Sequence, residues 1–135
     1  MKIYFSCSIT GGRADQRFYQ CIVDHLTARG HQVLTAHLSR SDVMQAEKLA
    51  NAELVYQRDI DWIYQCDLLI AEVSTPSHGV GYEIAYALNL EKPVICCFRS
   101  GRKVSKMILG NTHVKMTVFS YEQEDDLLNR IDFYL

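Results

Sequence analysis

Apolar residues recur along the chain in two alternating patterns, which are short continuous runs and longer stretches with a three- to four-residue spacing. The short runs predict five strands, over residues 3–6, 32–36, 67–73, 93–98 and 114–119. The spaced stretches predict helices over about 14–29, 53–65, 79–90 and 121–135, and a short helix near 104–109 in a basic loop. Residues 38–52 are polar and carry few signals, apart from Ser41 or Asp42 as a helix cap.

Strands that alternate with helices indicate an α/β fold. We predict a doubly wound, five-stranded parallel sheet of the flavodoxin/Rossmann-like kind, with strand order 2-1-3-4-5. The 135 residues are 48% apolar, so we expect residues 1–135 to form a single domain with one sizeable core. In such sheets, ligands bind beyond the carboxyl ends of the strands, where the strand order reverses. The loops at 8–13 and 74–81 should therefore meet near His37 in one crevice.

The charge and the cysteine content limit the kinds of binding partner and metal site that the sequence indicates. A net charge of −2, from 14 basic and 16 acidic residues, does not indicate binding to a nucleic acid polymer or a membrane surface. No apolar run is long enough to span a membrane, so we expect a cytoplasmic protein. The five cysteines and five histidines lack the spacing of metal sites. We therefore expect reduced thiols, no metal ion and no other cofactor.

The segment from Asp67 to Ala87 combines a buried strand, a loop of small residues and a new helix. Glu83 is predicted to lie in the first turn of that helix, where the helix dipole favours an ionised carboxylate. This placement suits an anionic nucleophile. The alternative is that Glu83 only stabilises its helix.

A second carboxylate comes from the preceding predicted helix. Stepping about 100° per residue from Leu54 places Asp59 within the apolar face, and Asp61 on the opposite side. A lone carboxylate on an apolar face requires a partner or a function, because burying it unpaired is costly. Asp59 is therefore a second catalytic candidate.

The loop at 8–13 enters a helix and could hold a phosphate through backbone N–H groups, the Ser8 hydroxyl and Arg13. It matches neither dinucleotide nor P-loop motifs, and a tight turn without a ligand is an equal alternative. Gly79-Val80-Gly81 begins like a dinucleotide motif, but Ile84 occupies the third glycine position, which argues against an NAD site.

Other candidate residues have ordinary structural explanations. Core packing explains Tyr4 and Trp62, and turn chemistry explains Ser77. His37 and His78 are expected in loops. A solvated surface is the usual explanation for the basic residues Arg99, Arg102, Lys103 and Lys106, although they follow the fourth strand on the ligand side of the sheet.

Taken together, the chain resembles the nucleoside 2-deoxyribosyltransferase superfamily, and within it the 2′-deoxynucleoside 5′-phosphate N-hydrolase family. The matching segments follow one another in the family's order over nearly the whole chain. They are Ile3-Tyr4-Phe5-x-x-Ser8-Ile9-x-Gly11-Gly12-Arg13, Val33-Leu34-Thr35-x-His37, Arg58-Asp59-x-x-Trp62 with Cys66-Asp67, Ala71-Glu72-Val73-x-x-Pro76-Ser77-x-Gly79-Val80-Gly81-Tyr82-Glu83, and Phe98-Arg99 with Ser105-x-Met107-Ile108.

The resemblance implies an N-glycosidase. Glu83 would attack C1′ of the sugar and form a covalent intermediate that water hydrolyses. Asp59 would assist leaving-group protonation and water attack, and Tyr4 would hold the carboxylates and the sugar, as in retaining glycosidases. The substrate would be a small nucleotide, a (2′-deoxy)nucleoside 5′-monophosphate.

The resemblance also implies the substrate contacts and a homodimer. Ser105 would come from the neighbouring subunit. The substrate-binding residues would be Ser8, Ile9, Gly11, Gly12, Arg13, His37, Trp62, Ser77, Gly79, Ser105 and Met107. Two positions depart from the family, because Cys7 replaces a glycine and Thr10 replaces an arginine. A base-exchanging deoxyribosyltransferase and a non-catalytic nucleotide-binding module are the alternative functions.

Overall fold

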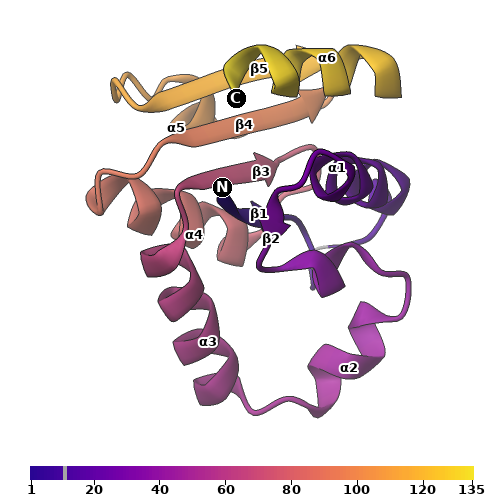
Figure 1. Cartoon of the computed structure of the whole chain (residues 1–135), viewed down its shortest axis with the longest axis vertical. Helices are drawn as coiled ribbons and strands as arrows, with labels where there is room; N and C mark the ends of the chain where they lie inside the picture. Colours follow the sequence, from indigo (N-terminus) through magenta and orange to yellow (C-terminus); the bar gives the residue numbers. More distant parts are fainter. Residues whose placement is uncertain (11) are drawn as a thin grey trace.

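Five parallel strands form one sheet in the computed structural model, which describes residues 1–10 and 12–135, without the side chains of Met44 and Ala46 (Figure 1). The order is β2-β1-β3-β4-β5, which confirms the predicted topology. All four pairings are parallel. The strands are β1 (Lys2–Ser6), β2 (Gln32–Val33), β3 (Leu68–Glu72), β4 (Val94–Arg99) and β5 (Met116–Tyr121).

Helices cover both faces of the sheet, and the sheet separates two hydrophobic cores, whereas a single core was expected. The helices are α1 (Gln16–Ala28), η1 (Ala36–Ser39), α2 (Val43–Leu49), α3 (Ala52–Gln65), α4 (His78–Asn89), α5 (Lys106–Leu109) and α6 (Glu124–Tyr134). Helices α1 and α6 pack on one face, while α3 and α4 pack on the other. No helix in the described part of the chain is long and apolar enough to cross a membrane.

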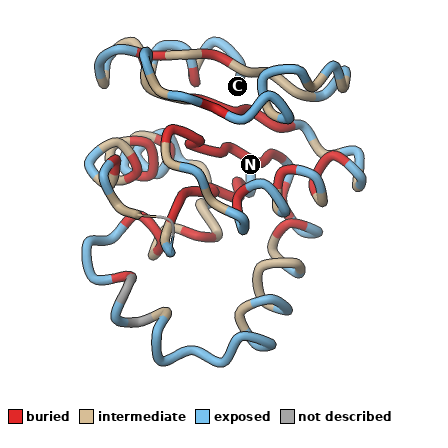
Figure 2. The backbone as a smooth tube through the Cα atoms, turned by 180° about the vertical axis from the view of Figure 1, so that it is seen from behind, coloured by how far each residue is buried: buried red, intermediate tan, exposed pale blue. Residues whose placement is uncertain are grey.

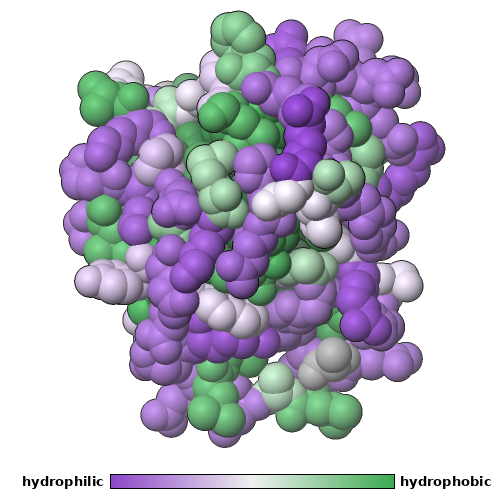
Figure 3. Space-filling model, in the orientation of Figure 1, coloured by the Kyte–Doolittle hydropathy of each residue, from purple (hydrophilic) through white to green (hydrophobic). Residues whose placement is uncertain are grey.

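Strand β1 shows how the sequence divides the two cores. Successive side chains of a strand point to opposite faces. Ile3 and Phe5 therefore enter the core beneath α1 and α6, whereas Tyr4 enters the core beneath α3 and α4. Buried residues follow the strands, and the outer turns of the helices are exposed (Figure 2). The face in Figure 3 is mainly hydrophilic, with hydrophobic side chains in separate patches.

Two strands differ from their predicted bounds by more than one residue at an end. β2 ends at Val33, because the Thr35 side chain replaces the strand pairing that was expected there. Its Oγ1 accepts a hydrogen bond from Phe5 N at 2.9 Å and donates one to Phe5 O at 2.6 Å. β5 begins two residues later than predicted and extends to Tyr121, since Val114 is 94% exposed outside the sheet.

The polar segment 38–52 contains helical structure that the sequence did not predict in detail. Asp42 occupies the N-cap position of α2, but its side chain pairs with Arg40 at 2.8 Å and makes no cap hydrogen bond. Leu54 was predicted to lie on the buried face of α3 but is 70% exposed, because the first turn of α3 extends beyond the core. Helix α2 and the start of α3 are mostly exposed (Figure 2).

Candidate active site

Glu83 lies on the face of α4 that meets the end of β1. The helix begins after Ser77, whose hydroxyl accepts a hydrogen bond from Val80 N at 3.4 Å. Glu83 is therefore in the second turn, and the prediction of a first-turn position was wrong. The helix dipole acts mainly within the first turn. Burial instead raises the pKa of Glu83 to about 7, although a hydrogen bond from Ser6 Oγ at 2.5 Å favours the charged form.

Tyr4 is fully buried on the same face of β1 as Ser6, because the two residues are two positions apart. Its hydroxyl makes no hydrogen bond with the described residues. Burial raises the pKa of this phenol above its ordinary range, and the neighbouring Glu83 and Asp59 charges raise it further. Tyr4 is therefore a neutral hydrogen-bond donor beside the two carboxyl groups.

Asp59 faces Glu83 from α3, which confirms its predicted inward orientation. Both residues line a pocket of about 230 Å³. Burial raises the pKa of Asp59, while the adjacent Arg58, which donates to it at 2.8 Å, opposes this shift. Burial therefore raises the pKa of both carboxyl groups in the pocket, and a different hydrogen-bond donor, Ser6 or Arg58, opposes the shift in each.

A polar and aromatic cluster lies beside this pocket. His37 and Trp62 contact edge to face, with ring centroids 5.8 Å apart. The Arg58 guanidinium lies over the Trp62 ring at 5.0 Å and pairs with Glu47 at 3.3 Å. Burial, and then the Arg58 charge, lowers the pKa of His37. The structure thus brings two of the predicted substrate-binding residues, His37 and Trp62, together.

The loop after β1 contains two buried polar atoms without partners among the described residues, Ser8 Oγ and Arg13 Nε. The terminal nitrogens of Arg13 donate to the backbone carbonyls of Ser8, Leu38 and Arg40, at 3.2, 2.9 and 2.7 Å. Arg13 therefore holds η1 against this loop.

Some of the other predicted substrate-binding residues lie near the pocket or in the 8–13 loop, and others lie away from the pocket. Gly79 lines the Glu83 pocket, Ile9 packs against the core beneath α1, and Gly12 adopts a φ of 126° that favours glycine. Gly11 lies outside the described residues. Ser105 caps the short α5 and Met107 is 82% exposed, and neither residue lines the pocket.

Sequence reasoning missed several residues of the site. Ser6 hydrogen-bonds Glu83, and its alternation with Tyr4 along β1 was a signal that could have found it. Tyr82 and Tyr56 line the pocket and contact edge to face, with ring centroids 6.2 Å apart. Their partial exposure gave no apolar periodicity to detect. Glu47 was missed because segment 38–52 had few signals.

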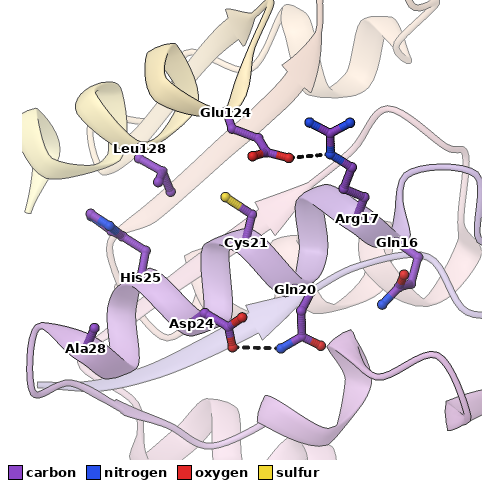
Figure 4. A pocket seen from close by; sticks show the side chains of 9 residues that line it. All are labelled: Gln16, Arg17, Gln20, Cys21, Asp24, His25, Ala28, Glu124 and Leu128. Atoms are coloured by element: carbon purple, nitrogen blue, oxygen red, sulfur yellow. Dashed lines mark hydrogen bonds and ion pairs between the residues drawn. The ribbon is translucent and has the colours of Figure 1, made fainter.

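A wider groove between α1 and α6 lies apart from these residues (Figure 4). Cys21 points into it, and the Arg17–Glu124 ion pair crosses one end. None of the predicted site residues lines it. Within the described part of the chain, no group of three or more His, Cys, Asp or Glu residues is arranged to hold a metal ion.

Comparison with known proteins places this geometry in a family. The nucleoside 2-deoxyribosyltransferase family model matches residues 3–129. The chain belongs to this family. A Methanococcoides burtonii protein, provisionally named 2′-deoxynucleoside 5′-phosphate N-hydrolase 1, is 41% identical over 118 residues, which cover 87% of this chain and 97% of the relative.

Two further family relatives bear the name 5-hydroxymethyl-dUMP N-hydrolase. The Mus musculus protein is 41% identical over 128 residues, covering 91% of this chain and 73% of the relative. The Danio rerio protein is 37% identical over 137 residues, covering 99% and 95%. Among solved structures, the Clostridium botulinum CMP N-glycosidase BcmB has a TM-score of 0.77 at 21% identity over both whole chains, which supports the fold.

Proposed function

We propose that this family member hydrolyses the N-glycosidic bond of (2′-deoxy)nucleoside 5′-monophosphates. The observation that carries the proposal is the shared pocket of Glu83 and Asp59, with the buried Tyr4 hydroxyl beside them. Two carboxyl groups in different environments suit a glycosidase, which needs one nucleophile and one proton donor. The products would be a free base and (2-deoxy)ribose 5-phosphate.

The first step uses the two carboxyl groups in different protonation states. An ionised Glu83 oxygen attacks C1′, the C1′–N bond breaks, and the protonated Asp59 donates its proton to the departing base. Burial raises the pKa of both carboxyl groups, while Ser6 stabilises the ionised form of Glu83 and Arg58 that of Asp59, so the reactive form is the one that holds a single proton, on Asp59. The product of this step is the free base and a sugar phosphate esterified to Glu83.

The second step regenerates the enzyme. Asp59, now a carboxylate, accepts a proton from water, whose oxygen attacks C1′ and releases Glu83. Tyr4, whose hydroxyl has no hydrogen-bond partner among the described residues, donates it to the Glu83 carboxyl group or to the sugar. His37 and Trp62 border the base.

The phosphate would lie between the 8–13 loop and the start of α4. The Ser8 Oγ, which has no partner among the described residues, and the N-terminus of α4 at Ser77 would supply donors, and the glycines Gly11 and Gly12 would let the chain come close to the phosphate. Ile9 and Gly79 would pack against the sugar phosphate, and Arg13 would supply charge and hold the loop. The names of the relatives support a 5′-phosphorylated substrate.

A homodimer would complete the site with Ser105 and Met107 of a second copy. Both residues are exposed on α5 and lie outside the pocket of their own chain. Their exposure leaves them available to a neighbouring subunit. Size-exclusion chromatography with light scattering should then give twice the 15.5 kDa chain mass.

A chromatographic screen tests the proposed reaction. Each common 2′-deoxynucleoside 5′-monophosphate, 5-hydroxymethyl-dUMP, and the matching nucleosides are incubated with the protein, with and without a second free base. We expect free base and sugar phosphate from monophosphates only. Base exchange without phosphate would instead support a deoxyribosyltransferase, and binding without base release would support a non-catalytic nucleotide-binding module.

A further inference from the structure

A carboxylate outside the Glu83 pocket, Asp15, is fully buried just after the 8–13 loop. Burying a charge is costly unless it is paired and hydrogen-bonded. Asp15 Oδ1 pairs with Arg99 Nη1 at 2.9 Å and with Arg102 Nη2 at 3.1 Å, and Thr75 Oγ1 donates to Oδ2 at 3.0 Å. Its partners therefore come from the end of β4 and from the loops that follow β3 and β4.

The Asp15 side chain does not cap the helix that it precedes, α1. Asp15 occupies the N-cap position of α1, where an aspartate side chain ordinarily accepts a hydrogen bond from the first turn. Here it makes no such bond, and only the backbone carbonyl accepts, from Phe18 N at 2.9 Å. The carboxylate is directed to the other loops, so its contacts serve the arrangement of those loops.

The Thr75 contact links the two loops proposed to hold the phosphate. Thr75 lies two residues before Ser77 at the start of α4. A Cβ on Gly12 would lie 3.6 Å from Thr75 Cγ2, an ordinary van der Waals distance, so the Thr75 side chain lies beside the 8–13 loop there. Gly12 also has a φ of 126°, which restricts the position to glycine. Asp15 therefore controls how the 8–13 loop sits against the loop that enters α4.

The two arginines complete the connection. Arg99 and Arg102 side chains are 39% and 37% exposed, whereas Asp15 is inaccessible. Arg99 N also donates to Ser74 Oγ at 2.7 Å, which attaches the same arginine to the loop before Ser77. One carboxylate thus fixes two cationic side chains at the carboxyl ends of β3 and β4, on the side where an anionic substrate would enter.

We propose that Asp15 is a positioning residue for the substrate's 5′-phosphate, acting through Thr75, Arg99 and Arg102. The inference rests on the proposed function, because it assumes that the phosphate lies between these loops. Asp15 touches neither the reacting atoms nor the Glu83 pocket. Its loss should weaken phosphate binding and leave the chemical step nearly unchanged.

Asp15→Asn tests the inference, because it keeps the shape of the side chain and removes the charge. Calorimetry measures the Kd of a 2′-deoxynucleoside 5′-monophosphate and of its matching nucleoside. Displaced loops should raise the Kd of the monophosphate about tenfold, with the nucleoside Kd within twofold of the parent value. In base-release assays, KM should rise with the same ratio while kcat changes less than about threefold.

Asp126→Asn is the matched control, since it removes the charge of a partly exposed aspartate that pairs with Arg130 at 3.0 Å. Its Kd and KM should equal those of the parent protein. Equal weakening of both ligands by Asp15→Asn, no weakening, or tighter monophosphate binding would each overturn the inference. Tighter binding would mean that Asp15 only opposes the phosphate charge.

Thr75→Val is a second variant that tests the same inference if the Asp15→Asn protein does not fold. It removes one hydroxyl while preserving both arginine pairs, and it should raise the monophosphate Kd by a smaller factor in the same ligand-selective way. An unchanged Kd would contradict the proposed link. Because calorimetry does not require turnover, a protein that binds monophosphates but releases no base would refute the proposed reaction without refuting the role of Asp15.

Discussion

Two buried glutamates with closely similar surroundings occupy different places in the molecule. Burial raises the pKa of both Glu83 and Glu72 to about 7, and a serine hydroxyl opposes the shift in each case. Glu83 accepts from Ser6, and Glu72 accepts from Ser74. Glu72 also accepts from Tyr121 at 2.9 Å, whereas the tyrosine near Glu83 keeps its hydroxyl free of described partners.

Access to a pocket separates the two carboxyl groups. Glu83 lines the same cavity as Asp59, while Glu72 is 0% exposed and its neighbours fill its hydrogen-bonding positions. A raised pKa alone therefore does not identify a catalytic residue, since buried structural networks also shift pKa values. The adjacent cavity distinguishes the candidate active site, together with a Tyr4 hydroxyl that has no hydrogen-bond partner in the described part of the chain.

The largest expected effect is on catalysis by Glu83→Gln. The amide fits the same space but cannot form the covalent intermediate, so base release should fall roughly a thousandfold or more. Calorimetry should still detect nucleotide binding, and Glu72→Gln serves as the matched control with turnover within about twofold of the parent. Comparable losses in both variants, or undiminished turnover in Glu83→Gln, would remove the distinction between the two glutamates.

A smaller effect is expected on the pH dependence. Since the attacking form of Glu83 is ionised, kcat/KM should rise with pH through a pKa of about 7. Ser6 stabilises that ionised form, so Ser6→Ala should move the rising limb upward by about one pH unit. Ser74→Ala removes the corresponding hydroxyl near Glu72 and should leave the limb in place. A pH-rate profile of each variant measures the shift.

The topology could be predicted from the sequence because parallel strands are continuous apolar runs, and helices between them fix the order. The inward position of Asp59 followed from helical periodicity in the same way. Glu83 shows where this reasoning failed, since one turn of helix decides whether the dipole or burial controls its pKa. Distant partners are not encoded in local patterns.

Asp15 is an example of such distant pairing. Its partners Arg99 and Arg102 are more than 80 residues away along the chain, and they were expected to be a solvated surface. Only the folded sheet brings the ends of β1, β3 and β4 together. Segment 38–52 was difficult for a different reason, because its short helices have little apolar periodicity and Glu47 is held by the tertiary contact with Arg58.

The smallest effect on activity, but a distinct effect on stability, is expected for Glu72→Gln. An unfolded glutamate ionises near 4.5, whereas folded Glu72 holds its proton up to about 7. The folded state therefore binds more protons between these values, and the free energy of unfolding falls as pH rises through this window, by about 2–3 kcal/mol for this group. Glutamine does not titrate, so Glu72→Gln removes this pH dependence of the free energy of unfolding.

Urea unfolding at pH 5 and pH 8 should show a smaller loss of stability in Glu72→Gln than in the parent protein. Glu83→Gln should also make the loss of stability between pH 5 and pH 8 smaller, so only the base-release assay separates the two variants. If the pH dependence of stability is unchanged in Glu72→Gln, then Glu72 is already ionised in the folded protein at pH 5.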